Sequence, residues 1–330
     1  MTEHPFAPYV RILGKGKSGA RSLTREEANI AMGMILRGEV DPVQLGAFLM
    51  LLRVKEESAE ELAGFVTAVR SHCNAPEIAI DLDWASYAGK RRQHPWYLLA
   101  ALALADSGLK IVMHGAAGHT ADRVYSEHLL RELGETVTGN WEDCAVAVAE
   151  RRFAYVPLRQ VSAPLQDIIE LRNLFGLRSP VHTLSRLLNP LNAPYSVQSI
   201  FHPAYGDSHQ RAAQLLGQAH AAVFKGEAGE AERKPEATCT VKYVHNGELS
   251  ECEWPRLLEG RQPWQEQLDV GTLRAAWCHN DLSDYGHNAI LGTIAIVLQL
   301  RNPDCSPDEC LQQAAEIWQN RDLQRLQTSN

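Results

Sequence analysis

The chain has 330 residues, of which 45% are hydrophobic and 22% charged, and its formal net charge is −8. This composition is typical of a soluble globular protein with one large domain or two ordinary ones. It excludes a protein that spans the membrane through helices, because no apolar run approaches the roughly 20 residues of a membrane helix. The net charge alone argues against nucleic-acid binding, but the acidic excess lies mainly in residues 212–330, which hold 10 Lys/Arg and 17 Asp/Glu.

The amino terminus and the cysteines also narrow the class of protein. The first eight residues lack the charged-then-apolar order of a secretory signal, so we expect a cytoplasmic protein. The seven cysteines are scattered and form no C-x-x-C pair, which argues against a zinc site and against a disulfide framework. No H-E-x-x-H pair occurs among the histidines. We therefore expect no metal site from residue spacing.

The first 72 residues have the pattern of a small helical unit. Thr24 and Glu27 form a capping-box pattern, after which apolar residues recur at helical spacing until Gly38. A second helix is expected over residues 43–54. A third is expected over residues 58–72, opened by the Ser-x-x-Glu pattern of Ser58 and Glu61.

From residue 78 onward strands and helices alternate, which predicts a parallel or mixed sheet covered by helices. A buried apolar helix from Leu98 should precede the first of four short strands. These strands are expected at residues 110–113, 153–157, 196–201 and 221–224. Residues 236–254 predict an antiparallel hairpin with Asn246-Gly247 as its turn. Helices are expected near residues 145–150, 208–218, 288–299 and 307–326.

Residues 164–188 return to helical periodicity inside this α/β half, so we expect them to pack onto the amino-terminal helices. The predicted organisation is a helical domain of residues 1–72 plus about 164–190 and an α/β domain of residues 73–163 plus 191–330.

Lysines and arginines gather in three places along the chain. Residues 11–25 hold five cations, no acidic residue and several glycines, which is typical of a mobile basic loop. The second place is the run Lys90-Arg91-Arg92, and the third contains Arg172, Arg178 and Arg186. Taken alone, a run of three cations is more often a solvated surface loop than a binding site.

Several short segments, in this order and spacing, together resemble the anthranilate phosphoribosyltransferase family (glycosyltransferase family three). The matching segments are Ile12-Leu13-Gly14-Lys15-Gly16, Leu23-Thr24-Arg25-Glu26-Glu27-Ala28, His114-Gly115, Leu171-Arg172, Gly176-Leu177-Arg178, Pro190-Leu191 and His287-Asn288-Ala289. Within the family, the chain is most similar to the divergent YbiB-type branch, which is described as nucleic-acid binding. The resemblance implies a nucleoside phosphorylase/phosphoribosyltransferase-like fold, α/β with a smaller all-α domain and a mixed central sheet flanked by helices. It also implies a homodimer formed through the amino-terminal helices, which Leu45, Phe48, Leu49 and Leu52 would support unless they face the protein's own core.

The sequence departs from the family at its phosphate-binding positions. The family's G-T-G-G-D-G loop, a glycine-rich anion cradle, corresponds here to residues 85–90, where Tyr87 replaces a glycine. The N-x-S-T segment that follows in the family corresponds to residues 95–98, which have lost every polar function. The acidic pair for magnesium corresponds to Gly229-Glu230-Ala231-Glu232, in which one carboxylate has become alanine. The resemblance implies a residual pocket of Gly89, His114, Gly115, Glu230 and Glu232. Within it we expect His114 to be a hydrogen-bonded structural histidine.

These departures favour a nucleic-acid-binding protein on a degenerate transferase fold, with no catalytic residue and no cofactor. The family fold implies that the three cationic groups border one cleft, where they would contact phosphates of DNA or RNA, single- or double-stranded, largely independently of sequence. Tyr87 would stack on unpaired bases, whereas Trp96 and Tyr97 more often belong to a core. The predicted contacts are Lys15, Lys17, Arg21, Tyr87, Lys90, Arg91, Arg92, Arg172, Arg178 and Arg186.

Two alternatives stay open. One is a phosphoribosyl- or other glycosyltransferase with an altered substrate, which would need magnesium, and in which Arg172 matches the arginine that holds the anthranilate carboxylate in the family. The other is a scaffold that works through its helical face. No membrane partner is expected under any of these hypotheses.

Overall fold

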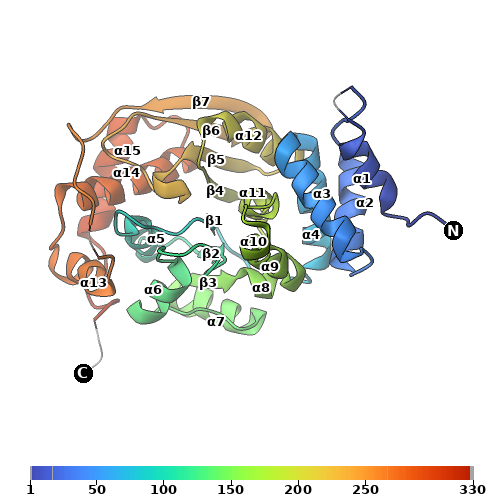
Figure 1. The fold of residues 1–330 in the computed structure, drawn as a ribbon. Helices are drawn as coiled ribbons and strands as arrows, with labels where there is room; N and C mark the ends of the chain where they lie inside the picture. Colours follow the sequence, from blue (N-terminus) through green and yellow to red (C-terminus); the bar gives the residue numbers. More distant parts are fainter. Residues whose placement is uncertain (1, 17, 266, 328–330) are drawn as a thin grey trace.

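The amino-terminal helices form a bundle at one side of the protein (Figure 1). The computed structural model describes residues 2–16, 18–265 and 267–327. The bundle consists of α1 (Ala7–Gly14), α2 (Arg25–Leu36), α3 (Pro42–Lys55) and α4 (Ala59–His72). Both predicted capping boxes are present, at Thr24 with Glu27 and at Ser58 with Glu61, and they fix where α2 and α4 begin.

The centre of the α/β part of the chain is a seven-stranded sheet in the order β3-β2-β1-β4-β5-β6-β7. The first five strands are parallel, whereas β6 and β7 are antiparallel additions at one edge. The predicted hairpin is confirmed, because Asn246 and Gly247 take the positive φ angles of 47° and 88° that a tight hairpin turn requires. The strands are β1 (Leu82–Ser86), β2 (Ile111–Gly115), β3 (Phe153–Pro157), β4 (Tyr195–Ile200), β5 (His220–Lys225), β6 (Cys239–His245) and β7 (Glu248–Trp254).

Alternate residues of the strands supply two different cores. Leu82 and Trp84 of β1 face a core shared with the carboxy-terminal helices, whereas Ala85 and Tyr87 face a core that continues into the amino-terminal bundle. Helix α5 (Trp96–Asp106) lies in the first core and is buried along nearly its whole length, as its uninterrupted apolar sequence predicts. The remaining α-helices before residue 220 are α6 (Ser126–Leu133), α7 (Trp141–Arg151), α8 (Leu158–Val161), α9 (Ala163–Glu170), α10 (Arg172–Phe175), α11 (Val181–Leu184) and α12 (Gly206–Leu215).

The segment from α9 to α11 returns to the amino-terminal bundle. Helix α9 contacts α2, and α11 contacts α4. These contacts follow the pattern that the sequence predicted for residues 164–188, while the domain boundaries at 72, 163 and 190 stay predictions.

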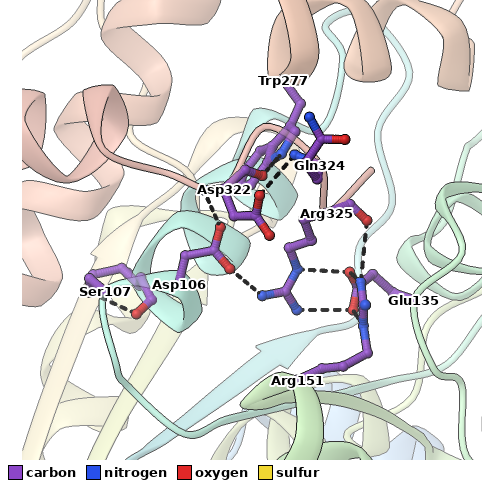
Figure 2. Close-up of polar contacts among 9 residues, drawn as sticks. Asp106, Ser107, Glu135, Arg151, Trp277, Asp322, Gln324 and Arg325 are labelled. Carbon is purple, nitrogen blue, oxygen red and sulfur yellow. Dashed lines mark hydrogen bonds and ion pairs between the residues drawn. The ribbon is translucent and has the colours of Figure 1, made fainter. Parts of the chain in front are cut away.

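The carboxy-terminal helices are α13 (Val270–His279), α14 (Asp284–Arg301) and α15 (Pro307–Gln319). The predicted last helix over residues 307–326 is too long, because the chain leaves the helix after Gln319. Beyond the end of the helix, Arg325 points back to Glu135 and Asp106 (Figure 2).

The predicted fold class is confirmed: a mixed sheet flanked by helices is joined to a smaller helical bundle. Across residues 2–16, 18–265 and 267–327, no helix has both the length and the apolar character needed to cross a bilayer.

Candidate anion-binding site

The loop that follows β1 already holds a carboxylate of the protein itself. Oε1 of Glu230 accepts hydrogen bonds from the backbone N–H groups of Ala88 (2.6 Å) and Gly89 (2.5 Å). Gly89 has a φ of 69°, and a Cβ there would come within 3.0 Å of the Tyr125 ring. A glycine is therefore required for the loop to present these amides. The frame of an anion cradle is retained, and Glu230 supplies its anion.

A second carboxylate lies at the amino-terminal end of α5. Glu232 accepts hydrogen bonds from the backbone N–H of Tyr97 (2.9 Å) and from Nζ of Lys90 (2.5 Å). A helix amino terminus attracts anions, because its first N–H groups lack partners within the helix. Burial raises the pKa of Glu232 to about 7, against the opposing effect of the Lys90 charge. The Lys90 and Glu232 side chains are completely buried.

The prediction that Lys90 contacts nucleic acid is therefore wrong, because its ammonium group is enclosed with Glu232. The prediction that Tyr87 stacks on unpaired bases is also wrong. Tyr87 has no exposed surface, and its hydroxyl is 2.6 Å from Nδ1 of His114. Nε2 of His114 lies 3.3 Å from Oδ2 of Asp83, and since a carboxylate oxygen only accepts, His114 donates to Asp83 there. His114 is thus a hydrogen-bonded structural histidine, as expected.

Gly115 and the aromatic residues of α5 are also structural. A Cβ on Gly115 would lie 2.0 Å from the carbonyl oxygen of Ser86, so only glycine allows β1 and β2 to approach here. Trp96 and Tyr97 are core residues, as preferred from the sequence.

Four arginines, Arg123, Arg172, Arg178 and Arg186, gather beside this loop and are called the arginine cluster below. Arg123, Arg172 and Arg186 donate hydrogen bonds to backbone carbonyl oxygens. Arg123 donates to Ala88 (2.9 Å) and Gly89 (2.8 Å). Arg186 donates to Ser199 (2.8 Å) and Gly229 (2.7 Å), and Arg172 donates to His119. None of the four forms an ion pair with a carboxylate in the part of the chain that the structure describes.

The charges of the arginine cluster repel one another. Burial lowers the pKa of Arg178 to about 10, and the like charges of Arg123, Arg186 and Arg172 add to this effect. Burial together with Arg178 also lowers the pKa of His119 to about 4. His182, whose ring centroid is 4.9 Å from that of His119, has a pKa well below its usual range for the same reasons. An anion placed among these groups would relieve the repulsion.

Three buried polar atoms near the cluster have no hydrogen-bond partner within the described residues: Nε of Arg172, Oγ of Ser179 and Nε2 of His182. Buried polar atoms are normally hydrogen-bonded, so an unpaired group is a candidate ligand contact. Arg123, Arg172 and Arg178 are partly exposed. Arg186 is only 6% exposed. The prediction that Arg186 touches nucleic acid is therefore wrong, although its charge acts on the same site.

The remaining predicted contacts lie at the surface. Arg91 and Arg92 are exposed: Arg91 lies 3.9 Å from Asp122, and Arg92 lies over the ring of Trp264. Lys15 is exposed, but Arg21 is paired through both terminal nitrogens with Glu27. Lys17 lies outside the described residues.

The three cationic groups do not converge as expected. The basic loop joins α1 to α2, and these two helices lie on the side of the bundle away from the sheet (Figure 1). Arg123 was missed by the sequence reasoning. It is isolated in the loop before α6, and nothing in the local pattern indicates that it reaches the loop after β1.

Magnesium does not fit the two carboxylates that the resemblance assigned to it. Glu230 and Glu232 are fully buried, three of their four oxygens accept protein hydrogen bonds, and Lys90 supplies the positive charge beside Glu232. The structure contains no group of three or more His, Cys, Asp or Glu with metal-binding geometry among its described residues.

Comparisons with known proteins agree with this architecture. Residues 8–73 match the helical bundle domain of a glycosyl transferase family, and residues 97–263 match the α/β domain of that family. The YbiB protein of Escherichia coli is 28% identical over 72% of this chain and 76% of its own length. The anthranilate phosphoribosyltransferase of Burkholderia cenocepacia is 27% identical over 71% of this chain and 69% of its own length. The crystal structure of anthranilate phosphoribosyltransferase from Thermus thermophilus matches 98% of this chain and 97% of its own, with a TM-score of 0.82 at 21% identity, which shows a shared fold.

Proposed function

Since this chain belongs to the anthranilate phosphoribosyltransferase-like glycosyl transferase family, we propose that it binds the phosphate backbone of nucleic acid through the partly exposed Arg123, Arg172 and Arg178 of its arginine cluster. One observation carries the proposal: Glu230 and Glu232 occupy the anion positions of the loop and of α5, while the neighbouring arginines have no carboxylate partner among the described residues. The positive charges free to bind an external anion are therefore those of the arginine cluster, beside the loop after β1.

The arginine cluster suits a polymer of phosphates better than a small activated sugar. Guanidinium groups bind phosphates through paired N–H donors, and partly exposed arginines reach a backbone that passes over the surface. Arg91 and Arg92 extend the positive surface from the loop after β1. Contacts to phosphates carry no base information, so binding would be largely independent of sequence and would weaken steeply with salt.

A second candidate function is phosphoribosyl transfer. The comparisons support it better than they support nucleic-acid binding, because the named activity among the matched relatives is that of anthranilate phosphoribosyltransferase. A pyrophosphate donor would have to displace Glu230 from the amides of Ala88 and Gly89. The raised pKa of Glu230, due mainly to burial, eases its protonation and release.

Replacing Arg178 by glutamate separates the two functions. We expect the affinity for a fluorescent oligonucleotide to fall about tenfold at low salt, and the slope of log affinity against log salt to decrease by about one. Fluorescence anisotropy at several salt concentrations measures both quantities. The matched control is Arg211→Glu, which reverses the charge of an exposed arginine on α12 and should leave binding unchanged.

Calorimetry with phosphoribosyl pyrophosphate and magnesium completes the test. Heat from binding that is lost when Gly89 is replaced by valine, together with no salt-sensitive oligonucleotide binding, would reverse the order of the two functions. Oligonucleotide binding that R178E and R211E weaken equally would place the contact elsewhere on the surface.

A homodimer is a further part of this proposal. The apolar residues predicted to support it do not lie on a free face, since Phe48, Leu49 and Leu52 are buried in the protein's own core. Helix α3 instead exposes Val43 (81%) and Val54 (84%), which lie about three turns apart and therefore on the same side of the helix. A dimer through this side would present two arginine clusters to one polymer.

Replacing both Val43 and Val54 by glutamate should convert the dimer into a monomer, because two charges would be buried in its interface. Sedimentation equilibrium measures the mass. Val146→Glu, at a 55% exposed position on α7, serves as the control and should leave the mass unchanged. A wild-type protein that sediments as a monomer at all concentrations would contradict the dimer.

A further inference from the structure

Trp264 is a large aromatic residue that the sequence reasoning did not single out. Its side chain is 54% exposed, whereas Trp84, Trp96, Trp254 and Trp277 are completely or almost completely buried. An indole ring this exposed offers aromatic surface that a partner can cover favourably.

The ring of Trp264 is held in place by the segment that follows Lys90. The guanidinium carbon of Arg92 lies 3.7 Å from the ring centroid, and that of Arg261 lies 5.6 Å away. Two hydrogen bonds join the segments on either side: the backbone N–H of Gln265 donates to the carbonyl of Arg92 (2.8 Å), and the side chain of Gln93 donates to the carbonyl of Pro263 (2.8 Å). The indole is therefore presented on a defined support.

This support is continuous with the arginine cluster. Lys90 and Val124 exchange two backbone hydrogen bonds of 2.8 Å, so the segments 90–92 and 122–124 lie side by side. Arg91 lies 3.9 Å from Asp122, the neighbour of Arg123 in the chain. Cations thus follow one another from Arg261 through Arg92 and Arg91 to the arginine cluster, with Asp122 beside Arg91 and Trp264 near the outer end.

Cations along a strip and an aromatic ring at its end are the two elements that bind unpaired nucleotides. The phosphates contact the cations, and a base stacks on the ring in a way that every base allows. A guanidinium against the same ring adds a cation–π contact and keeps the ring oriented. In a duplex the base faces are already stacked inside the helix, so a ring at the surface gains nothing from them.

We propose that Trp264, supported by Arg92, is a stacking subsite for an unpaired base, and that the chain therefore prefers single-stranded nucleic acid to duplex. The inference rests on the proposed binding of nucleic acid and specifies which form is bound. It assigns to Trp264 the role that the sequence reasoning gave to Tyr87, whose ring is enclosed beside His114.

The test compares two polymers that carry the same charge. One is a short oligothymidine, and the other is an abasic deoxyribose-phosphate polymer of the same length. Wild-type protein should bind the oligothymidine about tenfold more tightly, and Trp264→Ala should lose this preference by weakening only the oligothymidine complex. The salt slope should stay unchanged in W264A, because no phosphate contact is lost, whereas it should fall in Arg91→Gln.

Two further variants keep the result interpretable. Trp264→Phe retains an aromatic face and should recover most of the preference. Leu249→Ala removes a 44% exposed apolar side chain from β7 and should bind like wild type. Thermal melting checks that each variant is folded.

Equal affinity of the wild-type protein for the two polymers, or an unchanged preference in W264A, would overturn the stacking subsite and leave phosphate binding intact. Failure of the wild-type protein to bind either polymer would overturn both the proposed function and this inference.

Discussion

Replacing Arg325 by methionine is expected to lower the free energy of unfolding by about 3 kcal/mol, because buried Glu135 would lose one of its two arginine partners, keeping only Arg151, and Asp106 would lose its pairing with Arg325. Nε and one terminal nitrogen of Arg325 contact the two oxygens of Glu135 at 2.8 and 3.0 Å, and the other terminal nitrogen contacts Asp106 at 2.6 Å (Figure 2). Glu135 has no exposed side-chain surface and Arg325 only 6%. Methionine keeps much of the side-chain volume and removes the charge.

The same contacts hold the carboxy-terminal tail on the protein. The backbone N–H of Asp322 donates to Asp106 (3.0 Å), and the indole of Trp277 donates to the carbonyl of Asp322 (2.8 Å). R325M should therefore also increase hydrogen exchange in residues 320–327 while leaving the amino-terminal bundle unchanged. Urea denaturation measures the free energy of unfolding.

The matched control is Arg131→Met. Arg131 pairs with Glu127 on the surface of α6 at 3.2 Å, one helical turn away, and such exposed pairs contribute only about 0.3–0.5 kcal/mol. A loss in R325M no larger than that in R131M would contradict the role of the buried pair.

This contribution depends on pH. Burial raises the pKa of Glu135, but the hydrogen bonds of Arg325 and Arg151 outweigh burial, so the folded pKa is below the ordinary value of 4.5. The unfolded state then binds protons more readily, and the contribution is present above pH 4.5 and lost as the pH falls through the folded pKa. The difference between wild type and R325M should therefore shrink in acid.

Replacing Lys90 by methionine is the second change with a large expected effect. It should destabilise the protein by about 3–5 kcal/mol at alkaline pH, because Glu232 would lie fully buried without a cation and would either stay charged or have to take up a proton. A surface lysine that contacts only solvent or nucleic acid would cost almost nothing. Urea denaturation of K90M thus distinguishes a structural lysine from a binding one.

The effect of K90M has a definite pH dependence. The folded pKa of Glu232, about 7, lies above the ordinary 4.5, so the folded state binds a proton more readily and loses stability as the pH rises from 4.5 to 7. Without Lys90 this folded pKa rises further, and protonated Glu232 needs no cation. The destabilisation should therefore be larger at pH 8 than at pH 5.

Glu232→Gln tests the same pair from the other side. The double variant K90M/E232Q removes both charges and keeps an oxygen that can accept the Tyr97 N–H, so it should recover part of the stability lost in K90M. If K90M and wild type unfold at the same urea concentration at pH 8, the buried ion pair does not contribute to the stability of the fold.

The local parts of the fold were readable from the sequence because their signals lie within a few residues. The capping boxes at Thr24 and Ser58 and the Asn246-Gly247 turn each need only their neighbours. Strand β1 was missed, because buried Asp83 interrupts its apolar pattern. Its carboxylate lies beside His114, a partner that only the folded structure supplies.

The site was harder to predict, because the burial and charge of its residues depend on partners that are distant in the sequence. Lys90, Arg91 and Arg92 are equivalent in sequence, but Glu232, 142 residues further along the chain, buries the first and leaves the other two exposed. Arg123 and Trp264 each stand alone in a loop, where no periodicity or motif identifies them. The charge run alone therefore does not show that one of its cations is buried and two are exposed.

The carboxylates of Glu230 and Glu232 belong to the same chain as the amides that they occupy. They act as tethered competitors, whose local concentration is on the order of millimolar or higher. At equal intrinsic affinity, a free phosphate compound must exceed that concentration before it displaces the carboxylates from the loop after β1 and α5, so a dilute compound of similar affinity would not enter. Weak inhibition of oligonucleotide binding by high concentrations of inorganic pyrophosphate would then indicate that residues 226–232 open. It would not indicate a high affinity for pyrophosphate.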